Sequence, residues 1–233
     1  MRQETERNEN PTAGGAPLAK RRTKGGGLRL ADQAYLRIRD EIVTVQLRPG
    51  DPLDEKVLSQ RLEVGLTPVR DALKRLTLER LAIIYPRRGT FVTEINISDE
   101  RWLTETRIEL EGLAAALAAE RATDEECAAL AKLAGTLEDS SDLSLDYITV
   151  DTEIHRAIYA ASHNPYLESS LNQYANLALR IWYYGLQRMR PRTPRSCAQD
   201  EVVAAICARK PEAARKAAQS HLLGFSAEVR SLL

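Results

Sequence analysis

Three ionisable side chains in the second half of the chain are of the types that bind metal ions. Asp151 and His155 are four residues apart, so a helix places both on one side, next to Ile154 and Ile158. His221 follows much later, on another apolar helical face. Asp and His are good ligands for a divalent cation, and facing helices of a bundle can assemble such a site. The alternative is that these residues are ordinary polar groups of a helical core.

Arg107 is a further candidate functional residue, because its helical spacing points this charged side chain inward. It shares a face with Leu103, Leu110 and Ala114, and a buried cation is costly unless it is paired. Glu111, one turn further on, is a candidate partner; alternatively, the guanidinium is held ready for an anionic ligand. Either the core or a ligand pocket would use the aromatic residues Tyr147, Tyr174, Trp182, Tyr183 and Tyr184.

Basic residues in the first half of the chain have the spacing of a DNA-binding surface. Thr67-Pro68 predicts a helix start, with Thr67 as N-cap and phosphate contact and Pro68 at the first helical position. Arg70 and Lys74 then share an outward face, from which an arginine can read guanine in the major groove. The alternative is a solvated helix face.

A second basic group is the tripeptide Arg87-Arg88-Gly89, which lies between two β-rich segments. Glycine permits close approach to a sugar-phosphate edge, and the arginines supply charge for phosphate or the minor groove. The alternative is a plain polar hairpin tip.

Helical and strand periodicities indicate the elements that must position these side chains. Before residue 96 we expect helices from residue 30 to 45, from 54 to 62 and from 67 onward, and strands at 81–85 and 90–95. Three helices and a hairpin of this length predict a winged helix-turn-helix. From Ser98 onward no strand pattern occurs, and helices are expected at 99–121, 123–139, 144–162, 165–188, 196–209 and 211–231.

Composition limits the class of protein. The net charge is zero, but residues 1–28 carry six basic against three acidic residues, and residues 29–94 carry twelve against ten. A polyanion would therefore bind at the N-terminal end. Three cysteines without C-x-x-C spacing argue against a disulfide framework and favour a cytoplasmic protein. No apolar run approaches the roughly 18 residues that a membrane span needs, and residues 1–28 are predicted to form a flexible arm.

The segment LRPGDPLDEKVLSQRLEVGLTPVRDALKRLTLERLAIIYPRRGTFV resembles the DNA-binding domain of the GntR family of bacterial regulators. The resemblance covers about residues 30–95, and TPVRDAL with the downstream RRGTFV is its most specific part. It implies that Lys56, where relatives often have a basic residue, contacts DNA. Many relatives carry Ser-Arg where this chain has Gly65-Leu66. An arginine often used for base contact is therefore absent, and the operator of relatives does not transfer.

Residues 99–230 resemble the ligand-binding domain of FadR-type GntR regulators, often called the FCD domain. The shared features are Arg107-x-x-Leu110-Glu111, Asp151-x-x-x-His155, Asn164 and Ala213…His221. The resemblance implies a small carboxylate effector and one divalent metal per chain (Zn, Ni or Mn), which relatives hold with one Asp and three His. Asp151, His155 and His221 match three of these ligands, but Gln199 replaces the fourth. An amide oxygen is a poor ligand for zinc or nickel, so metal would bind weakly or not at all.

These features predict a mainly α protein that acts as a ligand-responsive repressor. A winged helix-turn-helix at 29–96 would bind a near-palindromic operator as part of a homodimer. An all-helical domain at 98–231 would form the dimer and bind a small organic acid through Arg107, Glu111 and Tyr147. Such a protein has no membrane partner.

Two rival functions remain open at this level. One is a metal-dependent enzyme that uses the Asp151/His155/His221 cluster, with the N-terminal domain as an accessory. Because the sequence contains no nucleophile–base pair, GxGxxG motif or P-loop, we do not expect an enzyme. The other is an architectural DNA binder without an effector, which would not need an inward-pointing Arg107.

Overall fold

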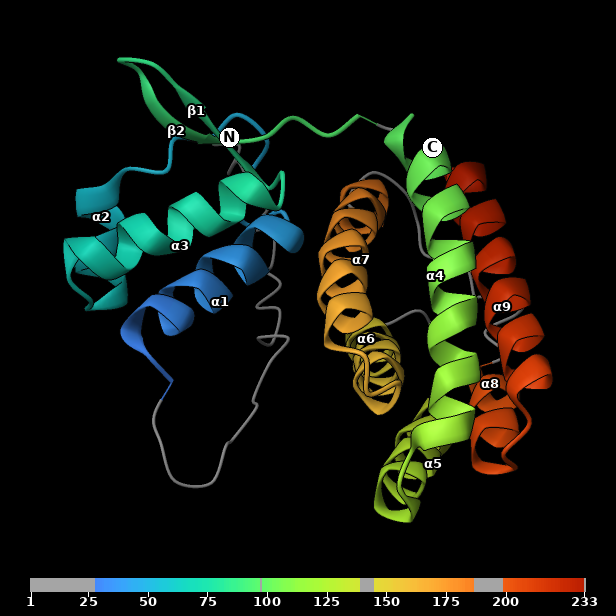
Figure 1. The fold of residues 1–233 in the computed structure, drawn as a ribbon. Helices are drawn as coiled ribbons and strands as arrows, with labels where there is room; N and C mark the ends of the chain where they lie inside the picture. The colour runs from blue at the N-terminus through green and yellow to red at the C-terminus, as the bar shows by residue number, and fades with distance from the viewer. Residues whose placement is uncertain (1–27, 97, 139–144, 187–198, 233) are drawn as a thin grey trace, which may run out of the picture.

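The structure is a computed structural model in which residues 28–96, 98–138, 145–186 and 199–232 are described. The expected arm at 1–28 therefore lies outside the described residues, apart from Leu28. The part of the chain that is described is mainly α-helical, as predicted, and forms a small domain with a hairpin beside a larger bundle of helices (Figure 1). None of the described helices is long and apolar enough to cross a membrane.

The N-terminal domain has the predicted winged-helix order of elements. Its elements are α1 (Leu30–Val43), α2 (Glu55–Leu62), α3 (Leu66–Leu78), β1 (Ala82–Tyr85) and β2 (Gly89–Val92). One apolar cluster joins all of them, from Ile38 of α1 through Leu76 of α3 to Val92 of β2. The Asp54 carboxylate caps α2 by accepting from the backbone N–H groups of Lys56 and Val57 at 2.8 and 2.9 Å. This single core therefore fixes the hairpin relative to α3.

Two boundaries in this domain differ from the prediction. Helix α3 begins at Leu66 with Gly65 as its N-cap, so Thr67 makes no capping hydrogen bond. Pro68 is nevertheless tolerated because the first N–H groups of a helix have no partner within it. Strand β2 ends at Val92 rather than at residue 95; the next residue, Thr93, still donates from its backbone N–H to the Leu81 carbonyl at 3.2 Å, and it also accepts hydrogen bonds from Arg180 of the bundle.

The C-terminal domain consists of helices close to those predicted. They are α4 (Asp99–Arg121), α5 (Asp124–Glu138), α6 (Leu145–Ala161), α7 (Pro165–Leu186), α8 (Gln199–Cys207) and α9 (Pro211–Leu232). The predicted capping box at the start of α5 is present: the backbone N–H of Thr123 donates to the Glu126 carboxylate at 2.8 Å, and the Glu126 N–H donates to the Thr123 hydroxyl at 3.2 Å. Of the helix predicted at 196–209, residues 196–198 lie outside the described residues.

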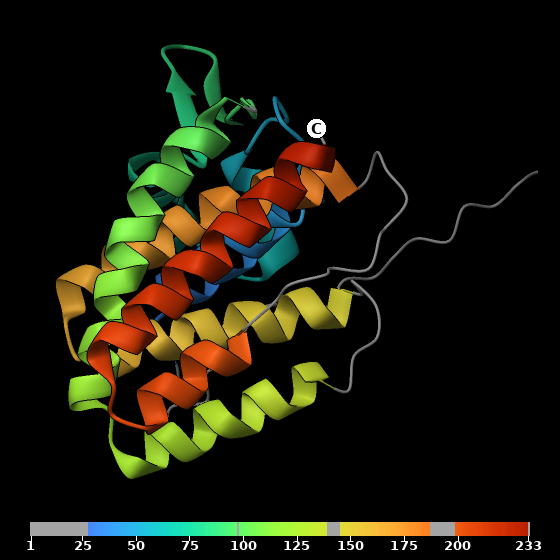
Figure 2. The ribbon, with the colours of Figure 1, turned by 90° about the vertical axis from the view of Figure 1, so that its right-hand side faces the viewer.

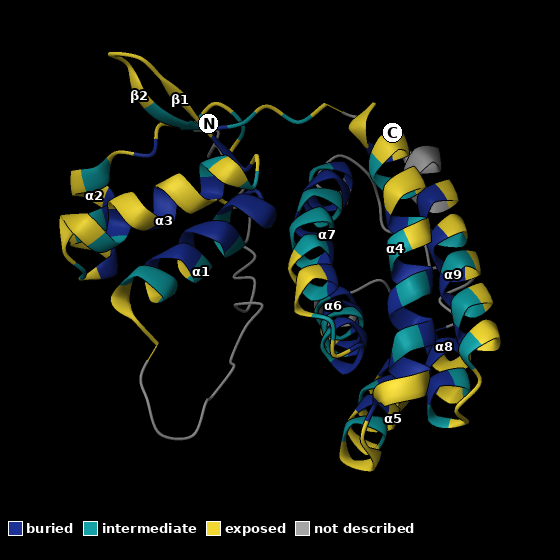
Figure 3. Ribbon diagram, viewed as in Figure 1, coloured by how far each residue is buried: buried dark blue, intermediate teal, exposed yellow. Residues whose placement is uncertain are grey.

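Helices α4 and α9 lie side by side along the bundle (Figures 1 and 2). Their contact is made of small residues: a Cβ added at Gly112 would lie 3.1 Å from the Gln219 side chain, and Ala115 and Ala118 are fully buried. Buried residues follow the inner faces of the helices, whereas the outer faces are exposed (Figure 3). Small side chains therefore set the close approach of α4 and α9.

The two domains meet where α1 and the end of β2 contact α7. Val43 and Val45, at the end of α1, share an apolar cluster with Ile181 of α7. Val45 has a backbone φ of 60°, a left-handed conformation that is strained for a β-branched residue. The buried Arg180 of α7 donates from Nη1 to the Thr93 hydroxyl at 2.7 Å and from Nη2 to the Thr93 carbonyl oxygen. We call this contact region the domain seam.

The close packing of α4 predicts the effect of enlarging a buried alanine. Ala118→Leu should lower the free energy of unfolding by about 1–3 kcal/mol, because the added atoms have no space against the neighbouring helices. Ala131→Leu, at an exposed position of α5, is the matched control and should change stability by less than about 0.5 kcal/mol. Urea denaturation followed by circular dichroism measures both. Equal stability of the two variants would show that this part of the core is loosely packed.

Candidate functional site

The basic residues of α3 are exposed, as a DNA-binding surface requires. Arg70 lies one turn into the helix, and its Nε is 2.6 Å from Oε2 of Glu55 at the start of α2. The sequence reasoning did not foresee this partner, although an acid at the first position of a helix is common. Lys74 projects from the same helix, with its Nζ 3.6 Å from Asp71. Thr67 and Lys56 are exposed as well.

The hairpin tip presents the second basic group to solvent. Arg87, Arg88 and Gly89 are all exposed. The backbone of Gly89 has a φ of +102°, which explains why glycine occupies this position, and no side-chain atom lies near it. The guanidinium of Arg88 lies 5.7 Å from the centre of the Tyr85 ring. The tip therefore offers two cations and an open backbone to a phosphate edge.

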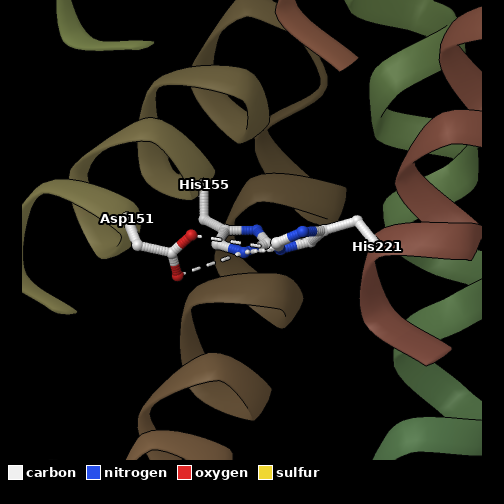
Figure 4. Close-up of side chains that lie close together, drawn as sticks. All are labelled: Asp151, His155 and His221. Carbon is white, nitrogen blue, oxygen red and sulfur yellow. Dashed lines mark hydrogen bonds and ion pairs between the residues drawn. The ribbon is translucent and has the colours of Figure 1, made fainter. Parts of the chain in front are cut away.

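The predicted metal ligands are brought together between α6 and α9 (Figure 4). Candidate ligand atoms of Asp151, His155 and His221 lie within 4.8 Å of one another. The Nε2 atoms of the two histidines are 3.2 Å apart, and Asp151 Oδ2 is 3.7 Å from His155 Nε2. The i, i+4 spacing on α6 explains the first pair, and the packing of α9 adds His221.

Ionisation in this cluster is set by burial and by neighbouring carboxylates. Burial alone would lower the pKa of His155, but Glu111 and Asp151 outweigh it, and the pKa is raised above its usual value. Burial lowers the pKa of His221 to about 4; Asp151 opposes this and His155 adds to it. The two histidines therefore differ in their affinity for a proton: the neighbouring carboxylates favour the protonated form of His155, whereas burial favours the neutral form of His221.

Gln199, at the start of α8, occupies the fourth position of the cluster. It is only 1% exposed, and its Nε2 lies 3.1 Å from Asp151 Oδ1 and 3.1 Å from His221 Nε2. The amide thus presents its N–H groups to the two ligands, and it would have to turn over to offer oxygen to a cation. The neighbouring Asp200 is exposed and points elsewhere. Three of the four positions therefore fit a divalent ion, and the fourth is a weak ligand at best.

Arg107 and Glu111 form a buried ion pair beside this cluster. The Arg107 Nη2 and the Glu111 Oε1 are 2.7 Å apart, and the other Glu111 oxygen lies 2.9 Å from Nδ1 of His155. Burial would raise the pKa of Glu111, but the two cationic neighbours hold it well below its usual range. Glu111 therefore remains charged, orients the His155 ring and leaves Nε2 of His155 facing Asp151 and His221.

Arg107 also lines a small pocket of about 20 Å³, which is room for about one water molecule. Asp151 and His155 line the same pocket, as do the apolar side chains of Leu179, Leu222 and Phe225. Trp182, one of the predicted aromatic residues, lies behind the pocket and stacks on Phe225 with ring centres 4.6 Å apart. Tyr147 belongs to α6, but its side chain lies outside the described residues.

The sequence reasoning missed Arg156, which also lines the pocket. It follows His155 directly and therefore points about 100° away from it on α6, off the face whose apolar spacing was considered. Nothing in the local sequence indicates its partners, because they come from other helices. The sequence signal for Arg156 was its position directly after His155, a candidate metal ligand.

A winged helix with an exposed basic recognition helix, joined to a bundle with a charged pocket, defines a DNA-binding regulator with a sensory domain. Comparison with known proteins agrees: residues 30–92 match the bacterial regulatory proteins of the gntR family, and residues 102–224 match the FCD domain. The chain belongs to the GntR family of transcriptional regulators, with an FCD effector-binding domain.

Individual relatives extend this result. The chain is 25% identical over 202 residues to the transcriptional repressor RspR of Escherichia coli, covering 86% of this chain and 89% of RspR. It is 33% identical over 123 residues to the Nta operon transcriptional regulator of Aminobacter aminovorans, covering 52% of this chain and 59% of that relative. The solved structure of E. coli McbR/YncC has a TM-score of 0.74 at 24% identity, covering 88% of this chain and 99% of that one. The relatives named here are regulators.

The position of Arg70 predicts a loss of operator affinity when its guanidinium is removed. Arg70→Ala should weaken binding to a duplex selected in vitro by about 1–3 kcal/mol per subunit, the value of one bidentate base contact. Lys74→Ala should chiefly reduce the salt dependence, as expected for a phosphate contact. Arg101→Ala is the control, because this exposed arginine also pairs with a carboxylate, Glu105, at 3.0 Å. Fluorescence anisotropy at several salt concentrations measures all three, and wild-type affinity of Arg70→Ala would remove this residue from the interface.

The fourth position of the cluster predicts that metal affinity is limited by Gln199. Gln199→His should bind Zn²⁺ more tightly than the wild type by on the order of tenfold or more, because imidazole replaces an amide. Gln173→His, on α7 and outside the cluster, should leave the affinity unchanged. Calorimetric titration of chelator-treated protein gives the constants, and a Gln199→His variant no tighter than the wild type would argue against metal binding here.

Proposed function

We propose that this protein is a homodimeric repressor whose operator binding is relieved by a small carboxylate bound in the helical domain. The winged helix at 29–96 would supply the DNA contacts, and residues 98–231 would supply the dimer and the effector site. Relatives named as repressors, RspR and GlaR of E. coli, support this direction of regulation. Residues 1–28 would act as an arm that precedes the DNA-binding domain.

The observation that carries the proposal is the buried, charged pocket around Arg107. A planar guanidinium can hold a carboxylate through two parallel hydrogen bonds. In this structure Nε and Nη2 of Arg107 both lie 2.7 Å from one carboxylate oxygen, Glu111 Oε1. Part of the lining is apolar, and because the pocket holds only about 20 Å³ in this structure, these side chains would have to move apart to admit a carboxylate. A neutral ligand would leave polar and charged groups without compensation, so the pocket favours an anion.

A divalent ion would strengthen the same site. Asp151, His155 and His221 would hold it, with Glu111 fixing the orientation of His155 from behind. When bound, the ion would offer a second positive anchor for the carboxylate. The chain's own residues bind the anion at Arg107 and exclude water with Leu222 and Phe225. Effector binding and metal binding are therefore expected to support each other.

DNA recognition would depend on the spacing of two winged helices in the dimer. The recognition helices must match half-sites about one helical turn apart, so a small change in their spacing weakens specific binding. A carboxylate that binds the two arrangements of the dimer with different affinity will change the operator affinity. The operator will in turn change the carboxylate affinity by the same factor. This is the mechanism by which a pocket in the bundle would control the winged helix.

The effector site predicts the behaviour of three arginine variants. At 100 times its dissociation constant, a carboxylate should stabilise the wild type by about 2.7 kcal/mol. Arg107→Met should lose this stabilisation, and Arg107→Lys should retain part of it, because an ammonium lacks the planar fork. Arg121→Met, which removes a hydrogen bond from Nη1 to the Ser162 carbonyl at 3.1 Å outside the pocket, should respond as the wild type does.

Thermal denaturation with a panel of small carboxylates, with and without Zn²⁺, measures this response. If Arg107→Met does not fold, Arg107→Lys keeps the charge of the pair with Glu111 and remains informative. A full ligand response in a folded Arg107→Met variant would place the effector site elsewhere in the bundle.

A further inference from the structure

A second, larger cleft lies at the domain seam. Its volume is about 410 Å³, against about 20 Å³ for the pocket beside Arg107. Ligand pockets commonly measure roughly 300–1,000 Å³ and occur preferentially at domain interfaces. The connection from β2 to α4 passes over one end of α7 (Figure 1) and forms one wall of the cleft. We call this hollow the seam cleft; its walls come from residues 93–96, from the start of α4 and from the second half of α7.

Arg180 is a buried cation of the seam cleft that has no ion-pair partner among the described residues. It is 3% exposed and lines the cleft. Its Nη1 and Nη2 donate to Thr93, and within the described part of the chain its Nε has no hydrogen-bond partner. Burial lowers the pKa of Arg180 to about 10, and Glu94 opposes this only in part. Because a buried charge is costly when it is not compensated, the guanidinium favours an anion in the cleft.

The hydrogen bonds of Arg180 join the two domains at this place. Its Nη1 donates to the Thr93 hydroxyl at 2.7 Å, and that hydroxyl donates to the Arg80 carbonyl oxygen at 2.9 Å. Arg80 lies between α3 and β1 and also lines the seam cleft. A ligand in the cleft would therefore contact the winged helix, the connection and the bundle together.

The aromatic side chains of the seam cleft indicate the shape of its ligand. Trp102, in the first turn of α4, is 61% exposed, and Tyr174 of α7 is half-buried. Both line the cleft, and aromatic rings favour a flat apolar group by stacking and by burial. Glu94 and Asp99 are exposed members of the lining. These two acids disfavour an anion that carries several charges.

We propose that the seam cleft is a second ligand site, which binds an aromatic monocarboxylate with its charge near Arg180 and its ring against Trp102 and Tyr174. The site is separate from the proposed effector site, because the seam cleft and the pocket at Arg107 share no lining residue. Since the ligand contacts both domains, it binds best when the winged helix is docked on the bundle. It therefore stabilises the docked arrangement.

The experiment uses the full-length protein with benzoate and phenylacetate as probes. Benzamide and phenylacetamide keep the ring without the charge, and acetate keeps the charge without the ring. Calorimetry measures the affinities. Acrylamide quenching measures the accessibility of Trp102, taken as the difference in fluorescence between the wild type and Trp102→Phe. The second of the two tryptophans, Trp182, is buried.

The variants test the aromatic wall and the cation separately. Trp102→Ala removes an exposed ring, and Tyr166→Ala, at an exposed position of α7 outside the cleft, is its matched control. Arg180→Met removes the charge, whereas Arg180→Lys keeps the charge without the planar fork. Arg107→Met tests whether the probes enter the other pocket.

We expect phenylacetate to bind more tightly than phenylacetamide or acetate by about tenfold or more. Trp102→Ala should weaken phenylacetate binding by about tenfold, whereas Tyr166→Ala and Arg107→Met should bind as the wild type does. Arg180→Met should bind the acid and the amide alike, and Arg180→Lys should keep part of the preference. A purely structural defect would weaken both ligands and leave the preference intact. Phenylacetate should also shield Trp102 from acrylamide.

The opposite results would overturn the inference. If the wild type binds phenylacetate no more tightly than phenylacetamide, or binds neither, the cleft does not take an aromatic anion. Loss of phenylacetate binding in a folded Arg107→Met variant would place the probe in the other pocket. If acrylamide fails to quench Trp102 in the ligand-free protein, a second copy of the chain or another segment already covers the cleft. Should Arg180→Met fold poorly, Arg180→Lys and Trp102→Ala decide between these outcomes.

Discussion

The pocket depends on one buried carboxylate, Glu111, which is shared by two cationic groups. It neutralises Arg107 on its own helix and holds the His155 ring from the neighbouring helix. Without it, Arg107 would lose its ion-pair partner in the interior, at a cost of several kcal/mol, and His155 would keep Asp151 at 3.7 Å. The position of the ring then fixes which nitrogen faces Asp151 and His221. A single acid thus orients both the arginine and the histidine of the proposed anion and metal sites.

The helices that supply the pocket residues also contact the helix that packs against the winged helix. Helices α4 and α9 supply Arg107 and His221 from a rigid, alanine-rich contact, whereas α6 supplies Asp151 and His155. Helix α7 lies next to these elements and makes the apolar and polar contacts of the seam. Because Ala175 and Leu179 of α7 line the pocket, the pocket and the contact with the winged helix share this helix.

Much of the architecture was readable from the sequence, because helical periodicity and capping residues are local signals. The winged helix, the six helices after residue 98 and the inward direction of Arg107 follow from spacing alone. The start of α3 was misplaced because Thr67-Pro68 is a strong local signal, while the tight turn at Glu63 and Gly65 restarts the helix two residues earlier. Local chemistry cannot decide between such neighbouring starts.

The candidate site was only partly readable for a different reason. Asp151 and His155 share a helix, so their proximity could be predicted, whereas the approach of His221 was expected from family resemblance. The partners of Arg70 and Arg156 come from other elements, Glu55 on α2 and Asn176 on α7. Such contacts depend on how helices pack, which no pattern within one helix contains. The role of Tyr147 stays a prediction, since its side chain is outside the described residues.

Val45 gives the seam an energetic property of its own. Its backbone sits in the left-handed region, which disfavours a β-branched residue by roughly 1–2 kcal/mol, and its buried side chain offsets this by packing between the domains. The turn that holds this backbone is closed within the N-terminal domain, because the Leu47 N–H donates to the Glu41 carbonyl at 3.0 Å. The strain therefore belongs to the end of α1, and the apolar contact with the bundle is what it makes possible. A glycine at position 45 would remove the strain but also the side chain that packs between the domains.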